Sequence, residues 1–287
     1  MSSKEHTEIL IDNVSKSFMD NDVLKGINLE ITSGEIIAIV GGSGCGKTVL
    51  LNTILGQYAP DAGRILVYDR THENGDLRDI TEFTRFEIDN IHKHWGVVFQ
   101  RNALFSGTVY KNIALWLTEV KDLEDSEILQ IAQRTLGAVG LPADQNFLNT
   151  DQNKLSGGMA KRLALARALS MDPYVIFYDE PTTGLDPRSS EQIHKLIQAT
   201  HNLKLPDNSN RTTLIITHDK DLLSRLRPRT VMLHNGIVHF DGLFDDFEVS
   251  DSEIIRPYFD LMPVLDQRYM EEIPQIPDIS KRKGLIM

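Results

Sequence analysis

The sequence predicts an α/β fold with a mainly parallel sheet. Continuous apolar runs, such as 36–40 and 175–178, are typical of strands that are buried on both faces. Helical segments alternate with these runs, and this alternation indicates parallel strands joined by helices. The stretch 106–172 is mostly helical and is expected to form a subdomain inserted into the sheet-containing core.

Local patterns predict the remaining elements in chain order. Residues 8–14 contain the apolar run Ile9–Ile11 and are expected to form an edge strand, while 27–31 alternate between apolar and polar residues, as in a half-buried strand. A glycine-rich turn and an apolar helix over 47–55 follow the strand at 36–40. Further strands are expected over 64–69, 96–100, 212–216 and 231–233, and further helices over 82–92 and 189–203.

Composition limits the classes of function. The 287 residues carry a formal net charge of −11, so nonspecific binding to nucleic acid is not expected. Cys45 is the single cysteine, which excludes an internal disulfide and fits a reducing compartment. We expect neither a signal peptide nor a membrane span, because no N-terminal apolar run is present and no stretch approaches about 18 apolar residues. A role at a membrane would require other chains to supply the spans.

A glycine-rich loop after the strand at 36–40 fits the pattern G-x-x-x-x-G-K-[ST]. Its residues are Gly41, Gly42, Ser43, Gly44, Cys45, Gly46, Lys47 and Thr48. Glycines leave room for phosphate oxygens to approach the backbone, and N–H groups at a helix start favour an anion. Lys47 adds a mobile positive charge for the β- and γ-phosphates, and the Thr48 hydroxyl can bind Mg²⁺. A chance glycine loop is the alternative, but the strand before it and the helix after it favour a nucleotide site.

Two carboxylates end the apolar strand at 175–178. Asp179 is expected to hold Mg²⁺ through water, and Glu180 to polarise the attacking water, which is most of what phosphoryl transfer requires. Two acids at the end of a strand can also be merely solvated. The phosphate loop that precedes them in the same sheet favours the catalytic interpretation.

A second anion-binding helix start is predicted at Leu155, Ser156, Gly157, Gly158 and Met159. Two phosphate-binding segments far apart in the sequence meet either within one chain or across a dimer, and their spacing leaves both arrangements open. Gly184, Leu185 and Asp186 follow soon after Glu180. His218 follows the strand at 212–216 and can contact the γ-phosphate, although a histidine after a strand is commonly structural.

Together these residues resemble the ATP-binding cassette family over about residues 7–243. In the terms of the family, the motifs are the Walker A loop at 41–48, the signature at 155–159, Walker B at 175–180, the D-loop at 184–186 and the switch histidine at His218. The resemblance implies an ATP hydrolase with a RecA-like P-loop NTPase core and an antiparallel β edge. The implied domains are a cassette over 7–245, with its core at 7–101 and 173–245 and its helical subdomain at 102–172, and a C-terminal extension over 246–287.

The resemblance also implies roles for two further residues. Gln100 matches the Q-loop glutamine, which touches Mg²⁺ and senses a transmembrane partner. Phe18 lies where the family places an aromatic ring that stacks on adenine, and a half-buried phenylalanine at a strand end is the alternative. The family works as a head-to-tail dimer, in which the signature of one subunit covers the Walker A loop of the other and two ATP molecules are clamped between them.

Two details narrow the resemblance. Met159 stands where most members of the family carry glutamine, and the Q-loop reads F-Q-x-x-A-L-F over 99–105 with Arg101 and Asn102 in its variable positions. These features look like the ATPases of the Mla and Mce lipid transporters. That similarity implies a transmembrane permease and an Mce-domain lipid-binding protein as partners, on the cytoplasmic face of the inner membrane.

Other functions remain open alternatives. An ABC importer or exporter for another solute would share the same motifs. A soluble cassette that acts on ribosomes or DNA usually carries two cassettes, a coiled coil or basic extensions, and this acidic chain has a single cassette. A regulatory binder that has lost hydrolysis would not be expected to keep Lys47, Asp179, Glu180 and His218.

The C-terminal extension is predicted to contain a short amphipathic helix followed by an extended arm. Its apolar residues recur at near-helical spacing, at Ile254, Ile255, Tyr258, Phe259, Leu261, Met262, Val264 and Leu265. These elements must pack either on their own cassette or on another chain, where they would hold a dimer together.

Overall fold

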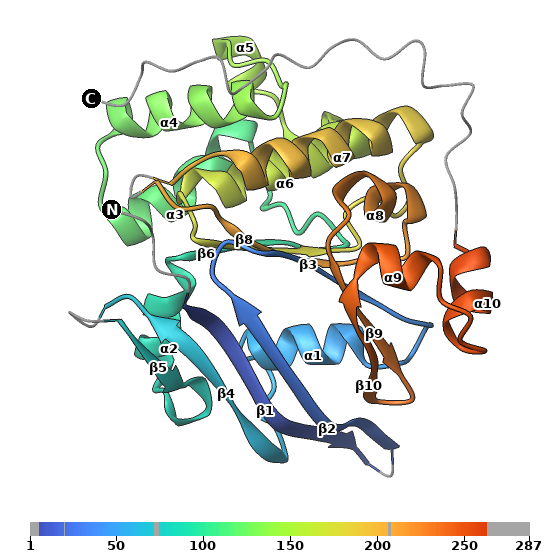
Figure 1. The fold of residues 1–287 in the computed structure, drawn as a ribbon. Helices are drawn as coiled ribbons and strands as arrows, with labels where there is room; N and C mark the ends of the chain where they lie inside the picture. Colours follow the sequence, from blue (N-terminus) through green and yellow to red (C-terminus); the bar gives the residue numbers. More distant parts are fainter. Residues whose placement is uncertain (1–5, 20, 72–74, 206–207, 263–287) are drawn as a thin grey trace. The chain divides into compact units, whose positions relative to one another are not determined.

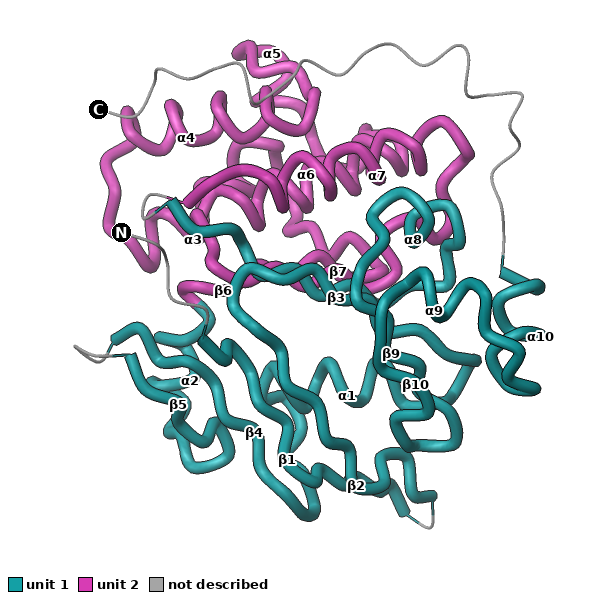
Figure 2. Tube along the Cα trace, in the orientation of Figure 1, with its two compact units in different colours: residues 1–92, 206–264 teal, residues 93–205, 265–287 magenta. Residues whose placement is uncertain are grey.

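The computed structural model of the chain describes residues 6–19, 21–71, 75–205 and 208–262, with helices and strands as labelled in Figure 1. The described residues divide into two compact units (Figure 2). Unit 1 lies within residues 1–92 and 206–264, and the described part of unit 2 is 93–205. Both units combine strands with helices, which confirms the predicted α/β class.

Unit 1 contains an antiparallel sheet built from the N-terminal part of the chain. Its strands lie in the order β2 (Asn21–Thr32), β1 (Thr7–Phe18), β4 (Ala62–Asp69) and β5 (Asp76–Asp79). The edge-strand prediction for residues 8–14 is wrong, because β1 pairs with β2 on one side and with β4 on the other. The polar segment after β4 forms β5, the 3-10 helix η1 (Ile80–Glu82) and helix α2 (Arg85–His92).

Parallel strands carry the phosphate loop of unit 1. β3 (Ile36–Val40) is parallel to β8 (Thr212–Ile216) and to β9 (Arg229–His234), and β10 (Ile237–Leu243) is antiparallel to β9. Every residue of β8 and all but the first of β3 are buried, as their continuous apolar runs predict. Ile39 pairs with Ile216, so β3 and β8 end at the same edge of the sheet.

Helices α1 and α8 begin shortly after these strands end. α1 (Lys47–Ile54) agrees closely with the predicted helix and buries Leu50, Leu51 and Ile54. α8 (Lys220–Leu226) was not predicted, and it is a short helix whose start is capped by the Asp219 carboxylate. The edge at which β3 and β8 end therefore leads into two helix starts within unit 1.

The C-terminal helices pack on unit 1 itself. α9 (Phe244–Glu248) and α10 (Ile255–Asp260) join β3 in one apolar cluster. The cluster comprises Ala38, Val40, Leu223, Met232, Phe244, Phe247, Ile255, Phe259 and Met262. The predicted helix is thus present and packs within its own chain, although Leu261 is 85% exposed and does not belong to the apolar face. The predicted arm, with Val264 and Leu265, lies outside the described residues.

Unit 2 combines a parallel pair of strands with most of the helices. β6 (Trp95–Val98) and β7 (Val175–Asp179) are parallel, and the residues of β7 are all buried. The helices and the 3-10 segment are α3 (Val109–Lys121), α4 (Asp125–Ala138), α5 (Gln145–Leu148), η2 (Gln152–Lys154), α6 (Gly157–Ser170) and α7 (Pro187–Asn202). The mostly helical character of 106–172 is confirmed, whereas the exact domain boundaries stay a prediction. In the part of the chain that is described, no helix is both long and apolar enough to cross a membrane.

Candidate functional site

The loop between β3 and α1 has the backbone that its glycines predict. Gly41 has a φ of +147° and Gly46 a φ of +105°. A Cβ at Gly41 would lie 2.3 Å from the carbonyl oxygen of Leu233, and one at Gly46 would lie 2.8 Å from a side-chain carbon of β2. These two positions therefore require glycine. At Gly42 and Gly44 a Cβ would meet no described atom within 4 Å, so this side of the loop is open to a ligand.

Lys47 lies across the loop that it follows. Its Nζ donates hydrogen bonds to the carbonyl oxygens of Gly41 (2.7 Å) and Gly42 (3.0 Å), and lies 3.8 Å from the Cys45 sulfur. α1 begins at Lys47 after Gly46, which has no side chain to cap the first N–H groups of the helix. Those N–H groups, the ammonium group and the exposed Ser43 and Thr48 hydroxyls can together bind a phosphate chain.

Phe18 presents an aromatic surface in the same unit. It ends β1 and is 40% exposed. Its ring meets Tyr58 edge to face, with 5.4 Å between the ring centroids, and the Lys16 ammonium lies 5.4 Å from its centroid. Asp61 anchors that ammonium at 2.7 Å. An exposed ring held in this way can stack on a base, and Tyr58 is a neighbouring aromatic that the sequence analysis did not single out.

His218 lies in the short connection between β8 and α8. Thr217, just before it, donates its N–H to the carbonyl oxygen of Ile39 (3.3 Å), which ties this connection to the end of β3. His218 itself is half-buried. Unit 1 therefore brings the start of the phosphate loop and the predicted histidine to one edge of its parallel strands.

Asp179 and Glu180 end the buried strand β7 in unit 2. Asp179 is 7% exposed, and Glu180 is half-buried and has a φ of +47°. A left-handed conformation at a residue other than glycine costs free energy and is concentrated at functional sites. The Thr183 hydroxyl donates a hydrogen bond to Glu180 Oε2 at 3.2 Å, which directs the carboxylate. Unit 2 thus supplies one largely buried carboxylate and one that is held at a strand end.

The predicted signature forms the start of α6, with Leu155 immediately before the cap. The Ser156 hydroxyl oxygen accepts a hydrogen bond from the N–H of Met159 (3.3 Å). A Cβ at Gly158 would lie 2.8 Å from the Ser189 hydroxyl, so a larger residue there would displace the Ser189 side chain at the start of α7. Gly157 and Ser156 are exposed, which leaves this helix start accessible to an anion.

Asp186 caps the start of α7. Its carboxylate accepts hydrogen bonds from the Ser189 N–H (3.0 Å) and the Ser189 hydroxyl (2.6 Å). These bonds lower the pKa of Asp186, the hydroxyl contributing most. The residue is therefore a charged helix cap, and its contact with nucleotide stays a prediction.

Gln100 follows β6 and is exposed, and a buried lysine fixes its backbone. The Lys161 Nζ donates to the carbonyl oxygens of Phe99 (3.0 Å) and Gln100 (2.8 Å). Lys161 is 2% exposed. Burial lowers its pKa from 10.5 to about 8, while the carboxylates of Asp179 and Glu180 act in the opposite direction. Lys161 was not predicted to belong to the site, because a lysine next to an arginine in a helix carries no signal that it is buried.

We expect Lys161→Met to lower kcat for ATP hydrolysis about tenfold, because the carbonyl groups of Phe99 and Gln100 lose the donor that holds this part of the Q-loop. Lys161→Arg should recover part of that loss, since a guanidinium group can still donate to both oxygens. The exposed Lys154, just before α6, offers a control, and Lys154→Met should leave kcat unchanged. Equal rates for Lys161→Met and the unchanged chain would show that the lysine does not position Gln100.

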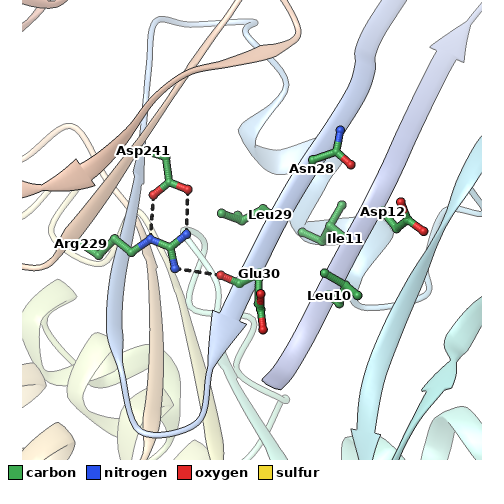
Figure 3. A pocket seen from close by; sticks show the side chains of 8 residues that line it. All are labelled: Leu10, Ile11, Asp12, Asn28, Leu29, Glu30, Arg229 and Asp241. Carbon is green, nitrogen blue, oxygen red and sulfur yellow. Dashed lines mark hydrogen bonds and ion pairs between the residues drawn. The ribbon is translucent and has the colours of Figure 1, made fainter. Parts of the chain in front are cut away.

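A hollow of about 500 Å³ in unit 1 lies apart from the predicted residues (Figure 3). Arg229 donates two hydrogen bonds of 2.7 Å to the Asp241 carboxylate and one of 2.8 Å to the carbonyl oxygen of Glu30. The guanidinium group is therefore already hydrogen-bonded to residues that line the hollow. The lining residues are Leu10, Ile11, Asp12, Asn28, Leu29, Glu30, Arg229 and Asp241. None of them was predicted to bind nucleotide.

The predicted residues fall into two groups, each of which has a coherent chemistry. Unit 1 carries the phosphate loop, Phe18 and His218, which can bind a nucleotide by its phosphates and its base. Unit 2 carries Gln100, Asp179, Glu180 and the signature, which can hold a metal ion, orient a water molecule and bind a second anion. These are the kinds of group that hydrolysis of a nucleoside triphosphate requires.

Comparison with known families and proteins identifies relatives of the chain. The family model described as ABC transporter matches residues 24–183. The chain is 33% identical to protein trigalactosyldiacylglycerol 3 of Arabidopsis thaliana, over 88% of this chain and 74% of that protein. It is 37% identical to the intermembrane phospholipid transport system ATP-binding protein MlaF of Haemophilus influenzae, over 74% of each. It is also 32% identical to the sulfate/thiosulfate import ATP-binding protein CysA of Pseudomonas putida, over 82% of this chain and 66% of that protein.

Solved structures share the fold. The ATP-binding cassette MJ0796, in a dimeric post-hydrolysis state bound to ADP and phosphate, matches with a TM-score of 0.69 and 28% identity, over 82% of this chain and 98% of that one. The protein cbiO1 of Clostridium perfringens, part of an ABC transporter complex, matches with a TM-score of 0.69 and 30% identity, over 84% and 90% of the two chains.

Proposed function

The chain belongs to the ABC transporter family and is its ATP-hydrolysing component, and we propose that it works as a dimer that drives a transmembrane permease for phospholipid or another lipid. The observation that carries the lipid assignment is the match to MlaF, together with Met159 in the signature and the Q-loop sequence over 99–105. The rest of the proposal concerns the residues of the site, the partner subunit and the cargo.

The residues of unit 1 bind the nucleotide in this proposal. Lys47 leaves the carbonyl oxygens of Gly41 and Gly42 and turns to the β- and γ-phosphates, while the N–H groups of the loop bind the remaining phosphate oxygens. Phe18 stacks on the adenine ring, for which its 40% exposure supplies the surface. His218 contacts the γ-phosphate from the edge where β3 and β8 end.

The residues of unit 2 act on the reacting atoms. Glu180 orients and polarises the attacking water, and the hydroxyl of Thr183 helps to hold its carboxylate in place. Gln100 lies on a backbone that Lys161 fixes, so movement of the Q-loop is coupled to the start of the signature helix. This coupling gives the permease a route by which it can influence hydrolysis.

The oxygen atoms in the site fit a Mg²⁺ ion. Thr48 would supply a hydroxyl, Gln100 an amide oxygen, and Asp179 a carboxylate that holds the ion through water, which are oxygen groups that suit Mg²⁺. Within the described ranges, no group of three or more His, Cys, Asp or Glu residues is placed to hold a metal ion. Phosphate oxygens of ATP and water molecules would complete the ligands in this proposal. When bound, the ion neutralises negative charge on the phosphates.

A second copy of the chain completes each site. In this proposal the exposed helix start at Ser156 and Gly157 does not contact the ATP bound to the Walker A loop of its own chain. Instead, the signature of one subunit covers the Walker A loop of the other. The dimeric state of MJ0796 supports this arrangement by analogy. The subunits then form a head-to-tail dimer with two ATP molecules between them.

A lipid cargo and a membrane location follow from the resemblance to MlaF, whose name describes intermembrane phospholipid transport. The permease spans the cytoplasmic membrane, this chain lies on its inner face, and an Mce-domain protein receives or delivers the lipid. An importer of another solute is the second candidate, which the 32% identity to a sulfate/thiosulfate import ATPase favours.

Purification of the tagged full chain from membranes of its own cells tests the proposal. We expect a polytopic permease and an Mce-domain protein to co-purify, and phospholipid vesicles to exchange lipid only when the reconstituted complex receives ATP. A substrate-binding protein for a small anion, with ATP hydrolysis that responds to sulfate and no lipid exchange, would establish the second candidate. Recovery of ribosomes or DNA without a permease would refute both.

A further inference from the structure

The C-terminal helix α10 makes a direct hydrogen bond to the phosphate loop. The backbone N–H of Gly41, the first residue of the loop, donates to the Tyr258 hydroxyl oxygen at 3.0 Å. Tyr258 lies on α10, 217 residues farther along the chain. None of the roles considered for the nucleotide site includes this residue.

Gly41 is also the residue that Lys47 contacts. The carbonyl oxygen of Gly41 accepts a 2.7 Å hydrogen bond from the Lys47 ammonium, while its N–H donates to Tyr258. Its Cα is confined as well, because a Cβ there would lie 2.3 Å from the Leu233 carbonyl oxygen. Any shift of Gly41 therefore changes the position of the group that holds the phosphate-binding lysine.

The packing of α10 holds the Tyr258 hydroxyl in place. Ile255 and Phe259 on the same helix are 3% and 4% exposed, and both belong to the apolar cluster that contains Val40. Tyr258 packs against this cluster and is half-buried. The Lys220 ammonium lies 3.9 Å from the centroid of the Phe259 ring and adds a cation–π contact to this packing. The hydroxyl therefore comes from a packed helix next to the strand that precedes the loop.

We propose that Tyr258 is a positioning residue for ATP binding, whose hydroxyl holds Gly41 so that the phosphate loop keeps its binding-competent conformation. Without this hydrogen bond the loop samples other conformations. The affinity for ATP then falls in proportion to the fraction of molecules whose loop is competent. The inference rests on ATP binding by the family and does not depend on the cargo or on the permease.

Tyr258→Phe tests the proposal, because it removes the hydroxyl and keeps the ring in the apolar cluster. Loss of one hydrogen bond of this kind corresponds to an increase of about two- to tenfold in the Kd of the full chain for a fluorescent ATP analogue. The KM for ATP should rise by the same factor, while kcat stays within about twofold, as for a residue that affects binding alone.

Tyr110→Phe is the matched control. It also removes one tyrosine hydroxyl, which is bonded to Asp125 in the helical part of unit 2, and it should leave Kd and KM unchanged. The melting temperature is measured for both variants. An unchanged Kd and KM in Tyr258→Phe would overturn the proposal. So would a fall in kcat together with a lowered melting temperature and an unchanged Kd, because the hydroxyl would then only stabilise the fold.

Discussion

Glu180→Gln is expected to lower kcat for ATP hydrolysis by about 10²-fold or more while ATP binding is retained. Glutamine has nearly the shape of glutamate, so the Thr183 hydroxyl can still bond to it and the strained backbone at residue 180 can persist. What the variant loses is the negative charge that is proposed to polarise the attacking water. Steady-state phosphate release and equilibrium ATP binding, measured on the same preparation, separate the two effects.

Glu119→Gln provides the control for this experiment. Glu119 is an exposed residue of α3 in the same unit, so its replacement makes the same change of charge away from the site. Its kcat should equal that of the unchanged chain. A rate for Glu180→Gln close to that of Glu119→Gln would remove Glu180 from the mechanism.

Ser156→Arg is expected to have the second largest effect, a loss of hydrolysis without a change in the ATP affinity of the monomer. The substitution removes the cap of α6 and places a long cationic side chain at an exposed helix start that is proposed to meet the partner's ATP. The Walker A loop of the same chain is left intact. Reduced ATP affinity of the monomer would instead mean that the signature acts within its own chain.

Mixing two inactive variants tests directly whether the signature of one subunit acts on the ATP bound to the other. Dimers that combine Ser156→Arg with Lys47→Ala contain one intact site, made from the loop of the first chain and the signature of the second, and one doubly altered site. Hydrolysis that returns on mixing, in dimers captured through two different tags, would demonstrate that the signature acts in trans. Each variant alone should remain inactive, which serves as the control.

The sequence predicted the parts of the fold whose signals are local. β3 and β7 are continuous apolar runs, and the glycines and Lys47 that follow β3 form a pattern with a physical reason at each position. β10 was not predicted because its alternation of apolar and polar residues spans only Val238–Asp241, ends at Gly242, and leaves none of its residues buried. β1 was assigned to an edge because its pairing with β4, about 50 residues farther along the chain, leaves no mark in its own sequence.

The contacts around the site that were missed are those made to distant backbone groups. Lys161 bonds to carbonyl oxygens 61 and 62 residues before it in the chain, and Tyr258 to an N–H 217 residues before it. A backbone partner has no characteristic residue type, so neither pair leaves a motif. The apolar spacing of Tyr258 and Phe259 was seen, but spacing alone could not say whether the helix packs on its own cassette or on another chain.

Sedimentation of Glu180→Gln with and without ATP shows whether two copies of this chain clamp ATP between them. Without nucleotide we expect monomers or a weak dimer. When ATP and Mg²⁺ are added, we expect a shift to a stable dimer. Introducing Ser156→Arg into the same chain should abolish that shift while ATP remains bound. A chain that binds ATP at saturation and still sediments as a monomer would show that ATP is not clamped between two copies.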